Sequence, residues 1–280
     1  GVASYMLEWY NVGGVHIHIK NMTLPIKSGL SSSAAICVLV ARAFNILYKL
    51  NLNTLGEMNI AYLGELRTQS RCGRLDQACA FGVKPSLMTF DGDEIDVKAL
   101  NIKKHLYWVF ADLCADKNTI QILSDLNRAY PFASNDKEKR EQAALGEKNR
   151  EIVDRAVRYM ADGNVEALGK LMTEAERLFN EEIAPMSEAL TAPKLRYVLT
   201  DPNIQHLIYG GKGVGSHGDG SVQFLARDEA SQQELVDYLN SNGMMAYKLT
   251  ICPVHTVHKA IVPVAGFGTR LYPATRCMKK

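Results

Sequence analysis

A short run of glycine and serine, Gly29 to Ser33, separates two different hydrophobic patterns and constrains the fold more than any other segment. Before it, Val15 to Lys20 alternates apolar and polar side chains, which is typical of a β-strand. After it, apolar side chains recur at helical spacing from Val38 to Leu50. We therefore expect the order strand, glycine turn, helix, which leaves unpaired backbone N–H groups at a helix N-terminus.

Such a helix N-terminus is suited to holding an anionic group. Its free N–H groups and the helix dipole both favour negative charge, and glycine lets the main chain approach a phosphate closely. The hydroxyl groups of Ser31 to Ser33 can cap the helix or bind Mg²⁺. A plain serine N-cap without a ligand is the alternative interpretation.

The rest of the N-terminal half predicts one further helix and two strands. Apolar residues recur at intervals of three and four residues from Thr54 to Thr68. Ser86 to Phe90 and His105 to Leu113 are typical of strands, and the turn sequence Asp91-Gly92-Asp93 lies between them. We expect these two strands to form an antiparallel sheet.

The C-terminal half predicts a helical layer followed by strands. Long amphipathic helical patterns cover Asn118 to Leu199 and break near three groups of turn residues, Pro131 to Asn135, Gly163-Asn164 and Ala184-Pro185. Three strands follow, with a helix at Ala230 to Asn242 between the last two: Ile204 to Tyr209, Ser221 to Ala226 and Met244 to Ile251. The alternation has no strict parallel order, which indicates an α+β fold.

The composition is that of a globular protein and excludes several classes of partner. With 280 residues, of which 47% are hydrophobic, the chain can bury one large core or two small ones. Its 32 basic and 30 acidic residues leave a net charge of +2, and no basic run is interleaved with aromatic residues, so no nucleic-acid partner is expected. Arg42 and Asn45 interrupt the longest apolar run, Ala34 to Tyr48, so no membrane span is expected.

The cysteines indicate reduced thiols and a cytoplasmic protein. They are scattered without CxxC pairs: Cys37, Cys72, Cys79, Cys114, Cys252 and Cys277. Cys252, His255 and His258 are ligand types for a metal, but no further ligand spacing supports a metal site there, so we interpret them as incidental.

The string from Pro25 to Ala35 resembles the central motif of the GHMP kinases, which include galactokinase and the homoserine, mevalonate and phosphomevalonate kinases. That motif consists of Pro, three residues, Gly-Leu, a small residue and Ser-Ser-Ala, and the chain matches every position. The chain has no GxxxxGK[ST] sequence, which disfavours a P-loop NTPase. The resemblance implies a two-layer α+β kinase fold with a C-terminal α/β subdomain, and ATP bound by Pro25, Gly29, Leu30, Ser31, Ser32, Ser33 and Ala34.

Two further segments continue this resemblance. Gly64-Glu65 is followed by Gly73-Arg74-Leu75-Asp76-Gln77, which is similar to the family's Gly-x-x-Asp-Gln or Asp-Asn segment. The resemblance implies that Ser33 and Glu65 bind Mg²⁺ and that Asp76 orients or deprotonates the acceptor hydroxyl. Phosphoryl transfer needs such positioning and charge neutralisation and little else.

A third glycine cluster, Gly210 to Gly220, is similar to the family's C-terminal glycine motif, which lies against the phosphate loop. From it we carry over Gly213, Gly215 and Ser216 as nucleotide-binding residues. The cluster departs from the family pattern at Val214, His217 and Asp219. Its glycine spacing also matches a dinucleotide-binding fingerprint, but a strand pattern follows where that fingerprint requires a helix.

The last residues, 258–280, resemble the opening strand and glycine loop of sugar-1-phosphate nucleotidyltransferases. A nucleotidyltransferase uses a sugar 1-phosphate, so a kinase fused upstream of it would phosphorylate the anomeric hydroxyl of a monosaccharide. We expect an N-terminal kinase domain at residues 1–115, a C-terminal kinase domain at 116–255 and the start of a fused nucleotidyltransferase at 256–280.

The N-terminal substrate motif of the family is absent and the chain does not begin with Met, so we expect an N-terminally truncated kinase whose activity is open. Two alternatives stay open. One is a mevalonate-type kinase of the same fold, and the other is a non-catalytic nucleotide-binding module.

Overall fold

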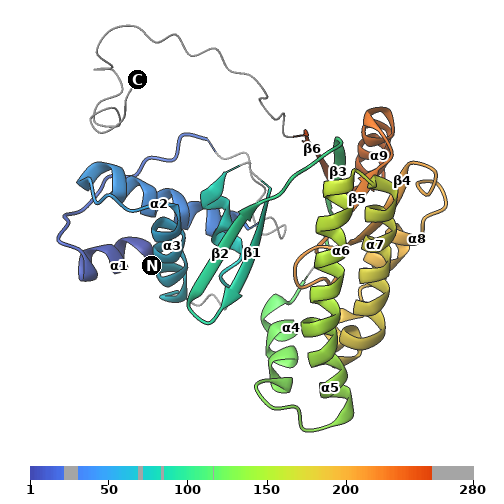
Figure 1. The fold of residues 1–280 in the computed structure, drawn as a ribbon, viewed down its shortest axis with the longest axis horizontal. Coiled ribbons are helices and arrows are strands. Elements are labelled where there is room, and N and C mark those ends of the chain that lie inside the picture. The colour runs from blue at the N-terminus through green and yellow to red at the C-terminus, as the bar shows by residue number, and fades with distance from the viewer. Residues whose placement is uncertain (22–30, 69–71, 83–84, 116, 254–280) are drawn as a thin grey trace, which may run out of the picture.

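The computed structural model describes residues 1–21, 31–68, 72–82, 85–115 and 117–253 (Figure 1). Pro25, Gly29 and Leu30, which the sequence assigns to nucleotide binding, lie outside the described residues, as does the segment from residue 254 onward. Within the described part of the chain, none of the helices combines the length and the apolar character that a bilayer crossing requires.

The N-terminal part packs three helices together: α1 (Val2–Trp9), α2 (Ser32–Tyr48) and α3 (Thr54–Leu66). Helix α3 begins where the Asn53 side chain accepts a hydrogen bond of 2.8 Å from the backbone N–H of Gly56. The helices share a core formed by Val2, Met6, Ala41, Phe44 and Ile60. The two helices that the sequence predicts here are confirmed.

A short 3-10 helix, η1 (Asp76–Phe81), connects α3 to a hairpin formed by β1 (Ser86–Asp91) and β2 (Glu94–Ala99). The expected turn is confirmed, with Gly92 in a left-handed conformation at φ 55°. The expected partner of β1 was wrong, because β1 pairs with β2 across this tight turn and not with the strand near residue 106. The alternation of Ile95 and Val97 with charged residues was the available signal for β2.

The expected strand at Val15 to Lys20 is not formed. A strand requires a neighbouring strand for its backbone hydrogen bonds, and the described residues pair none with this segment. Val15 instead packs against the core shared by α1, α2 and α3, and Gly14 accepts a hydrogen bond of 2.9 Å from the Tyr48 hydroxyl. The alternating pattern therefore belongs to an extended connection over the helices.

The C-terminal part is built around a four-stranded antiparallel sheet with the order β4-β5-β3-β6. Strand β3 (Leu106–Asp112) lies in the centre, paired with β5 (Ser221–Ala226) on one side and β6 (Met245–Ile251) on the other. Strand β4 (Ile208–Gly213) pairs with β5 and forms an edge. The strands predicted at β5 and β6 are confirmed.

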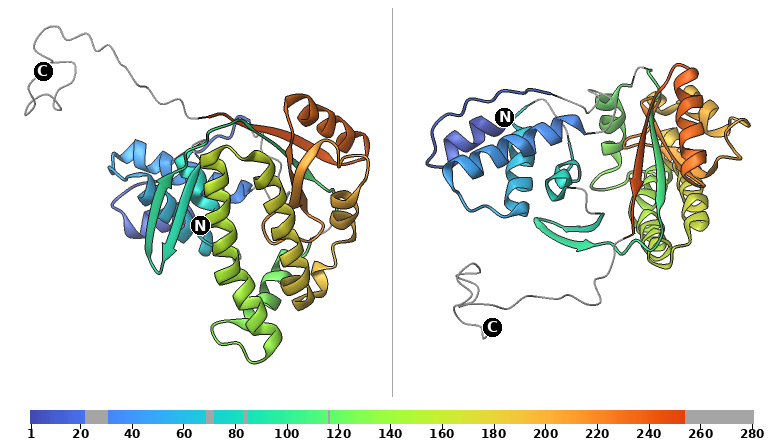
Figure 2. Two further views of the ribbon diagram at one scale, coloured as in Figure 1. Left: turned by 45° about the vertical axis from the view of Figure 1, so that its right-hand side comes forward. Right: turned by 90° about the horizontal axis from the view of Figure 1, so that it is seen from above.

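Helices cover both faces of this sheet. Helices α6 (Asn149–Asp162) and α7 (Val165–Leu178) lie on one face, and α8 (Pro193–Thr200) and α9 (Glu229–Ser241) on the other. Helices α4 (Thr119–Leu126) and α5 (Asp136–Ala143) pack away from the sheet, and Ile122 of α4 belongs to a separate core. Leu195 of α8 and Leu235 of α9 share one core with Phe224, whereas Leu168 of α7 shares another with Leu225. Because Phe224 and Leu225 are neighbours in β5, their side chains point to opposite faces. The N-terminal helices and this sheet lie at opposite ends of the molecule (Figures 1 and 2).

Strand β4 begins later than the sequence predicts. Turns with consecutive backbone hydrogen bonds occupy residues 201–207 instead, so several glycines of the third cluster lie in a strand and not in a loop. Glycine is required there because α7 crosses β4 closely: a Cβ atom on Gly210 would lie 1.9 Å from the carbonyl oxygen of Gly169. This close crossing fixes α7 against the strand that leads into the site.

Candidate active site

The N-terminus of α2 presents the predicted serine run. Ser31 is the N-cap residue with a left-handed backbone at φ 54°, and its side chain makes no capping hydrogen bond. The first N–H groups of α2 have no acceptor within the helix, because a helix bonds each N–H to the carbonyl four residues earlier. Ser33 is exposed on the first turn, and Ala34 is buried beneath it. The positive end of the α2 dipole therefore lies at the serine run.

Ser33 is connected directly to the predicted glutamate. Its Oγ donates a hydrogen bond of 2.8 Å to Oε1 of Glu65, which lies on α3 and is 4% exposed. The other carboxylate oxygen, Oε2, accepts a hydrogen bond of 2.8 Å from Nε2 of Gln77. Gln77 follows Asp76 in η1, so one buried carboxylate links the serine run to the segment that carries the aspartate.

Arg42 fixes η1 against α2 and α3. Its Nε lies 2.8 Å from Oε2 of Glu57 on α3, and its Nη2 donates a hydrogen bond of 2.8 Å to the carbonyl oxygen of Ala80 in η1. Asn45 completes the group by donating to Oε1 of Glu57 at 2.8 Å. Arg42 appears in the sequence only as a charge inside an apolar run, and its pairing with Glu57 could not be read from the spacing of the two residues.

The serine run, Asp76 and the third glycine cluster meet around one cavity of about 550 Å³. Such a volume falls in the range of small-molecule sites. Twelve residues line it: Ser31, Ser32, Ser33, Asp76, Asp112, Ala115, Lys117, Thr119, Val214, Gly215, Ser216 and Gly220. The cavity thus brings together residues that are far apart in the sequence, and six of them are residues that the sequence assigns to nucleotide binding or catalysis.

Three further assigned residues that the structure describes, Ala34, Glu65 and Gly213, do not line this cavity. Glu65 lies beneath Ser33, and Ala34 is buried in the first turn of α2. Gly213 ends β4, and its backbone N–H already donates a hydrogen bond of 2.9 Å to Oε2 of Glu176. The backbone N–H of Gly213 is therefore bonded within the protein, and of the three assigned residues of this cluster only Gly215 and Ser216 line the cavity.

A buried pair between Glu176 and His217 anchors the turn that follows β4. His217 Nδ1 lies 3.2 Å from Glu176 Oε2, and the His217 ring stacks on Phe179 with ring centres 3.6 Å apart. Three residues of this turn, Gly215, His217 and Gly218, have left-handed backbones with φ between 58° and 71°. Of the three, only His217 departs from glycine, and its side chain is what ties the turn to α7.

Burial and the interactions within this pair shift the pKa of each of its two members in opposite directions. Burial favours a raised pKa for Glu176, but hydrogen bonds from His217, the Gly213 amide and Asn180 outweigh it, so the pKa of Glu176 is lowered. For His217, burial lowers the pKa, and Glu176 opposes this only in part. The pair at neutral pH is therefore a carboxylate in contact with a neutral imidazole.

Asp219 accounts for another departure from the family pattern. Its Oδ1 accepts a hydrogen bond of 2.8 Å from the backbone N–H of Leu195, in the first turn of α8. Helix α8 begins with Pro193 and has no side-chain cap of its own, so Asp219 satisfies one of its open N–H groups. His217 and Asp219 thus hold the glycine turn to α7 and α8.

The oxygens of Ser33 and Glu65 fit a magnesium ion. In an octahedral shell with metal–oxygen distances of about 2.0–2.1 Å, adjacent ligands lie roughly 2.9 Å apart. The Ser33 Oγ and Glu65 Oε1 atoms are 2.8 Å apart. Among the residues that the structure describes, there is no group of three or more His, Cys, Asp or Glu side chains suited to a metal. Magnesium held here would take most of its ligands from phosphate oxygens and water, as it commonly does.

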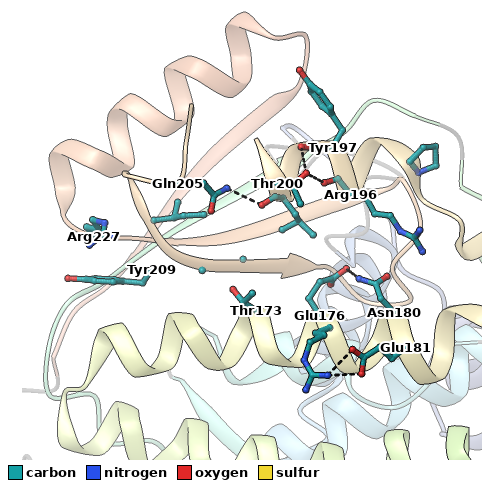
Figure 3. A pocket seen from close by; sticks show the side chains of 16 residues that line it. Thr173, Glu176, Asn180, Glu181, Arg196, Tyr197, Thr200, Gln205, Tyr209 and Arg227 are labelled. Carbon is teal, nitrogen blue, oxygen red and sulfur yellow. Dashed lines mark hydrogen bonds and ion pairs between the residues drawn. The ribbon is translucent and has the colours of Figure 1, made fainter. Parts of the chain in front are cut away.

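A larger cavity of about 890 Å³ lies between α7, α8 and β4 (Figure 3). It contains none of the residues assigned to the site from the sequence. Glu176 and Asn180 stand on its wall, joined by a hydrogen bond of 3.0 Å, and Arg177 pairs with Glu181 beside them (Figure 3). We place the chemistry in the smaller cavity because the open helix N-terminus and Asp76 lie there.

Comparison with known proteins places the fold in a known group. Residues 1–83 match the family model described as GHMP kinases N terminal domain. The crystal structure of Lactococcus lactis galactokinase complexed with galactose superimposes with a TM-score of 0.67 at 14% identity, covering 90% of this chain and 73% of that one. The L. major mevalonate kinase in complex with R-mevalonate gives a TM-score of 0.62 at 19% identity, covering 81% of this chain and 67% of that one. The chain has the α+β fold of the GHMP kinases.

The sequence relatives include galactokinases. The galactokinase of Thermotoga petrophila is 27% identical over 267 residues, covering 84% of this chain and 73% of the relative. That of Thermococcus kodakarensis is 30% identical over 210 residues, covering 65% of this chain and 58% of the relative. These likenesses support a small-molecule kinase of the GHMP type.

Proposed function

We propose that this protein is an ATP-dependent kinase that phosphorylates a monosaccharide. The observation that carries the proposal is the single cavity at which the open N-terminus of α2, Asp76 and the Gly215-Ser216 turn meet. Phosphoryl transfer from ATP needs an anion site, and a carboxylate near the acceptor oxygen can orient or deprotonate it; the residues that line this cavity can supply both. The galactokinase relatives support a sugar as the acceptor.

In the proposed reaction, an oxygen of the sugar hydroxyl forms a bond to the terminal phosphorus of ATP. The bond from that phosphorus to the bridging oxygen breaks, and ADP leaves with the electron pair. Asp76 lies exposed at the start of η1 and accepts the proton of the attacking hydroxyl. The N–H groups of Ser32 and Ser33 hold phosphate oxygens at the positive end of α2. Ser33 and Glu65 would hold Mg²⁺, which neutralises phosphate charge when bound.

The acceptor is proposed to be the anomeric hydroxyl. This rests on the resemblance of residues 258–280 to enzymes that use sugar 1-phosphates, and those residues lie outside the described part of the chain. On this proposal the product of the kinase is the substrate of the unit that begins at residue 256.

A coupled assay of ADP release tests the proposal with a panel of monosaccharides and mevalonate. ³¹P NMR of the product then distinguishes a 1-phosphate from other positions. Turnover of a monosaccharide is expected. Turnover of mevalonate alone would favour the mevalonate-type kinase, and ATP binding without turnover of any acceptor would favour a non-catalytic module.

Asp76→Asn tests the role of the carboxylate. Losing a positioned acid–base group costs about a hundredfold or more in turnover, whereas nucleotide affinity should stay within about twofold. Asp93→Asn is a matched control, because Asp93 is fully exposed and, among the described residues, pairs only with Arg74. Equal turnover in both variants would remove Asp76 from the proposed mechanism.

A further inference from the structure

Lys117 is the one cationic side chain among the described residues that line the cavity of about 550 Å³. Two acidic side chains, Asp76 and Asp112, share the wall with it. Lys117 lies between β3 and α4, in the C-terminal part of the molecule, and is half-buried. The charge of Lys117 therefore reaches the cavity from the C-terminal part of the molecule, whereas the N-terminus of α2 reaches it from the N-terminal part.

The ammonium group of Lys117 has no hydrogen bond or ion pair with another described residue. The nearest acidic residue in β3, Asp112, turns its Oδ1 to the backbone N–H of Cys114 at 2.8 Å. Burial lowers the pKa of Lys117, because the loss of water disfavours its charged form. A half-buried cation without a carboxylate costs free energy unless an anion completes the site.

The glycines at the end of the third cluster make room for this side chain. A Cβ atom on Gly220 would lie 2.7 Å from Lys117 Cδ and 3.5 Å from its Nζ. A Cβ atom on Gly218 would lie 3.6 Å from Lys117 Cγ. The stem of Lys117 therefore lies over these two glycines, while Gly215 and Ser216 face the same cavity a few residues earlier. The glycine cluster thus both lines the cavity and holds the cation in place.

We propose that Lys117 binds the terminal phosphate of the nucleotide and neutralises charge on the phosphoryl group as it is transferred. The inference rests on the proposed function, because it takes the cavity to be the ATP site. Lys117 neither donates nor accepts a proton in this role. A terminal phosphate carries the largest negative charge of the nucleotide, and the helix N-terminus alone supplies only about half an elementary charge.

Calorimetric titration with ATP and with ADP, each in excess Mg²⁺, tests this assignment on the chain and its variants. A hydrogen bond to a charged group is worth about 1.5–3 kcal/mol, which corresponds to roughly a 10- to 100-fold change in affinity. Lys117→Met should weaken ATP binding by this factor and ADP binding by less than about threefold. Lys117→Arg, which keeps the charge, should restore most of the ATP affinity.

Two further variants serve as tests of the contact. One changes the position of the Lys117 side chain, and the other removes a positive charge elsewhere on the molecule. Gly220→Ala leaves the charge of Lys117 but displaces the end of its flexible side chain, so it should also weaken ATP binding selectively. Lys170→Met removes an exposed lysine of α7 that pairs with Glu166, and it should leave both affinities unchanged. Circular dichroism of each variant confirms that the chain is folded.

The results distinguish the inference from the function on which it rests. Unchanged ATP affinity in Lys117→Met would overturn the role of Lys117 while the kinase proposal stands. Equal losses for ATP and ADP would overturn the assignment to the terminal phosphate. Unchanged ATP affinity in Gly220→Ala would overturn the position given to the side chain. If the unaltered chain bound neither nucleotide, the proposed function itself would fail.

Discussion

Glu176 is the residue whose removal should disturb the glycine turn most. Its carboxylate is buried and accepts hydrogen bonds from the Gly213 amide at 2.9 Å and from Asn180 at 3.0 Å, with His217 Nδ1 at 3.2 Å. Glu176→Ala leaves these donors without their acceptor. Asn180 can be rehydrated from the neighbouring cavity (Figure 3), so the cost comes mainly from the two buried donors.

The expected loss follows from the charged hydrogen bonds. Each is worth about 1.5–3 kcal/mol, so Glu176→Ala should lower the free energy of unfolding by about 3–6 kcal/mol. Glu176→Gln keeps an acceptor oxygen and should cost about 1–2 kcal/mol. Glu181→Ala is the matched control in the π-helical turn Phe179–Ile183 that follows α7, because Glu181 is 53% exposed in its ion pair with Arg177 and should cost less than about 1 kcal/mol.

Urea unfolding followed by tryptophan fluorescence measures these differences. The chain has two tryptophans, and replacing the exposed Trp9 by Phe leaves Trp108 in β3 as a reporter of the C-terminal sheet. A lower midpoint with an unchanged slope would give the loss directly. If Glu176→Ala cost no more than Glu181→Ala, the buried network would not be what holds the glycine turn, and our account of His217 would fail with it.

Two further predictions concern packing and pH. Gly169→Ala would place a Cβ atom 2.3 Å from Tyr209 Cβ and should cost at least about 2 kcal/mol in thermal unfolding, whereas Gly146→Ala meets nothing within 4 Å and should be neutral or stabilising by up to about 1 kcal/mol. Because the pKa of His217 is lowered in the folded state, the unfolded chain binds more protons below its ordinary pKa of 6.5. Stability should therefore be fully present above pH 6.5 and fall as the pH is lowered below it, less steeply in His217→Asn; equal slopes in both proteins would contradict this.

The local elements could be predicted well from the sequence. Helix α3 follows from its apolar spacing, and β5 and β6 follow from short apolar runs between turn residues. The six assigned residues that line the cavity were predicted by matching short motifs. Such motifs indicate contacts that hydrophobic periodicity does not. Ser33, Glu65 and Asp76 are separated along the chain, and only the motif indicated that they lie together.

The failures have a common physical cause, which is that pairing depends on what is nearby in space. Val15 to Lys20 has a strand pattern, but no described strand lies beside it. Gly210 suggests a loop, yet it lies in β4. Glycine is needed there because Gly169 of α7 leaves no room for a side chain. Lys117 and Glu176 gave no signal, since their importance comes from burial and from partners that are distant in sequence.

The wall of the cavity of about 550 Å³ is contributed by two regions with separate hydrophobic cores. Ser31 to Ser33 and Asp76 belong with the N-terminal helices, whereas Lys117 and the Gly215-Ser216 turn belong with the C-terminal sheet. A nucleotide that touches both walls would act as a non-covalent crosslink between these regions. Its binding energy would therefore also set how far the two regions can move apart, and release of product would require that crosslink to open.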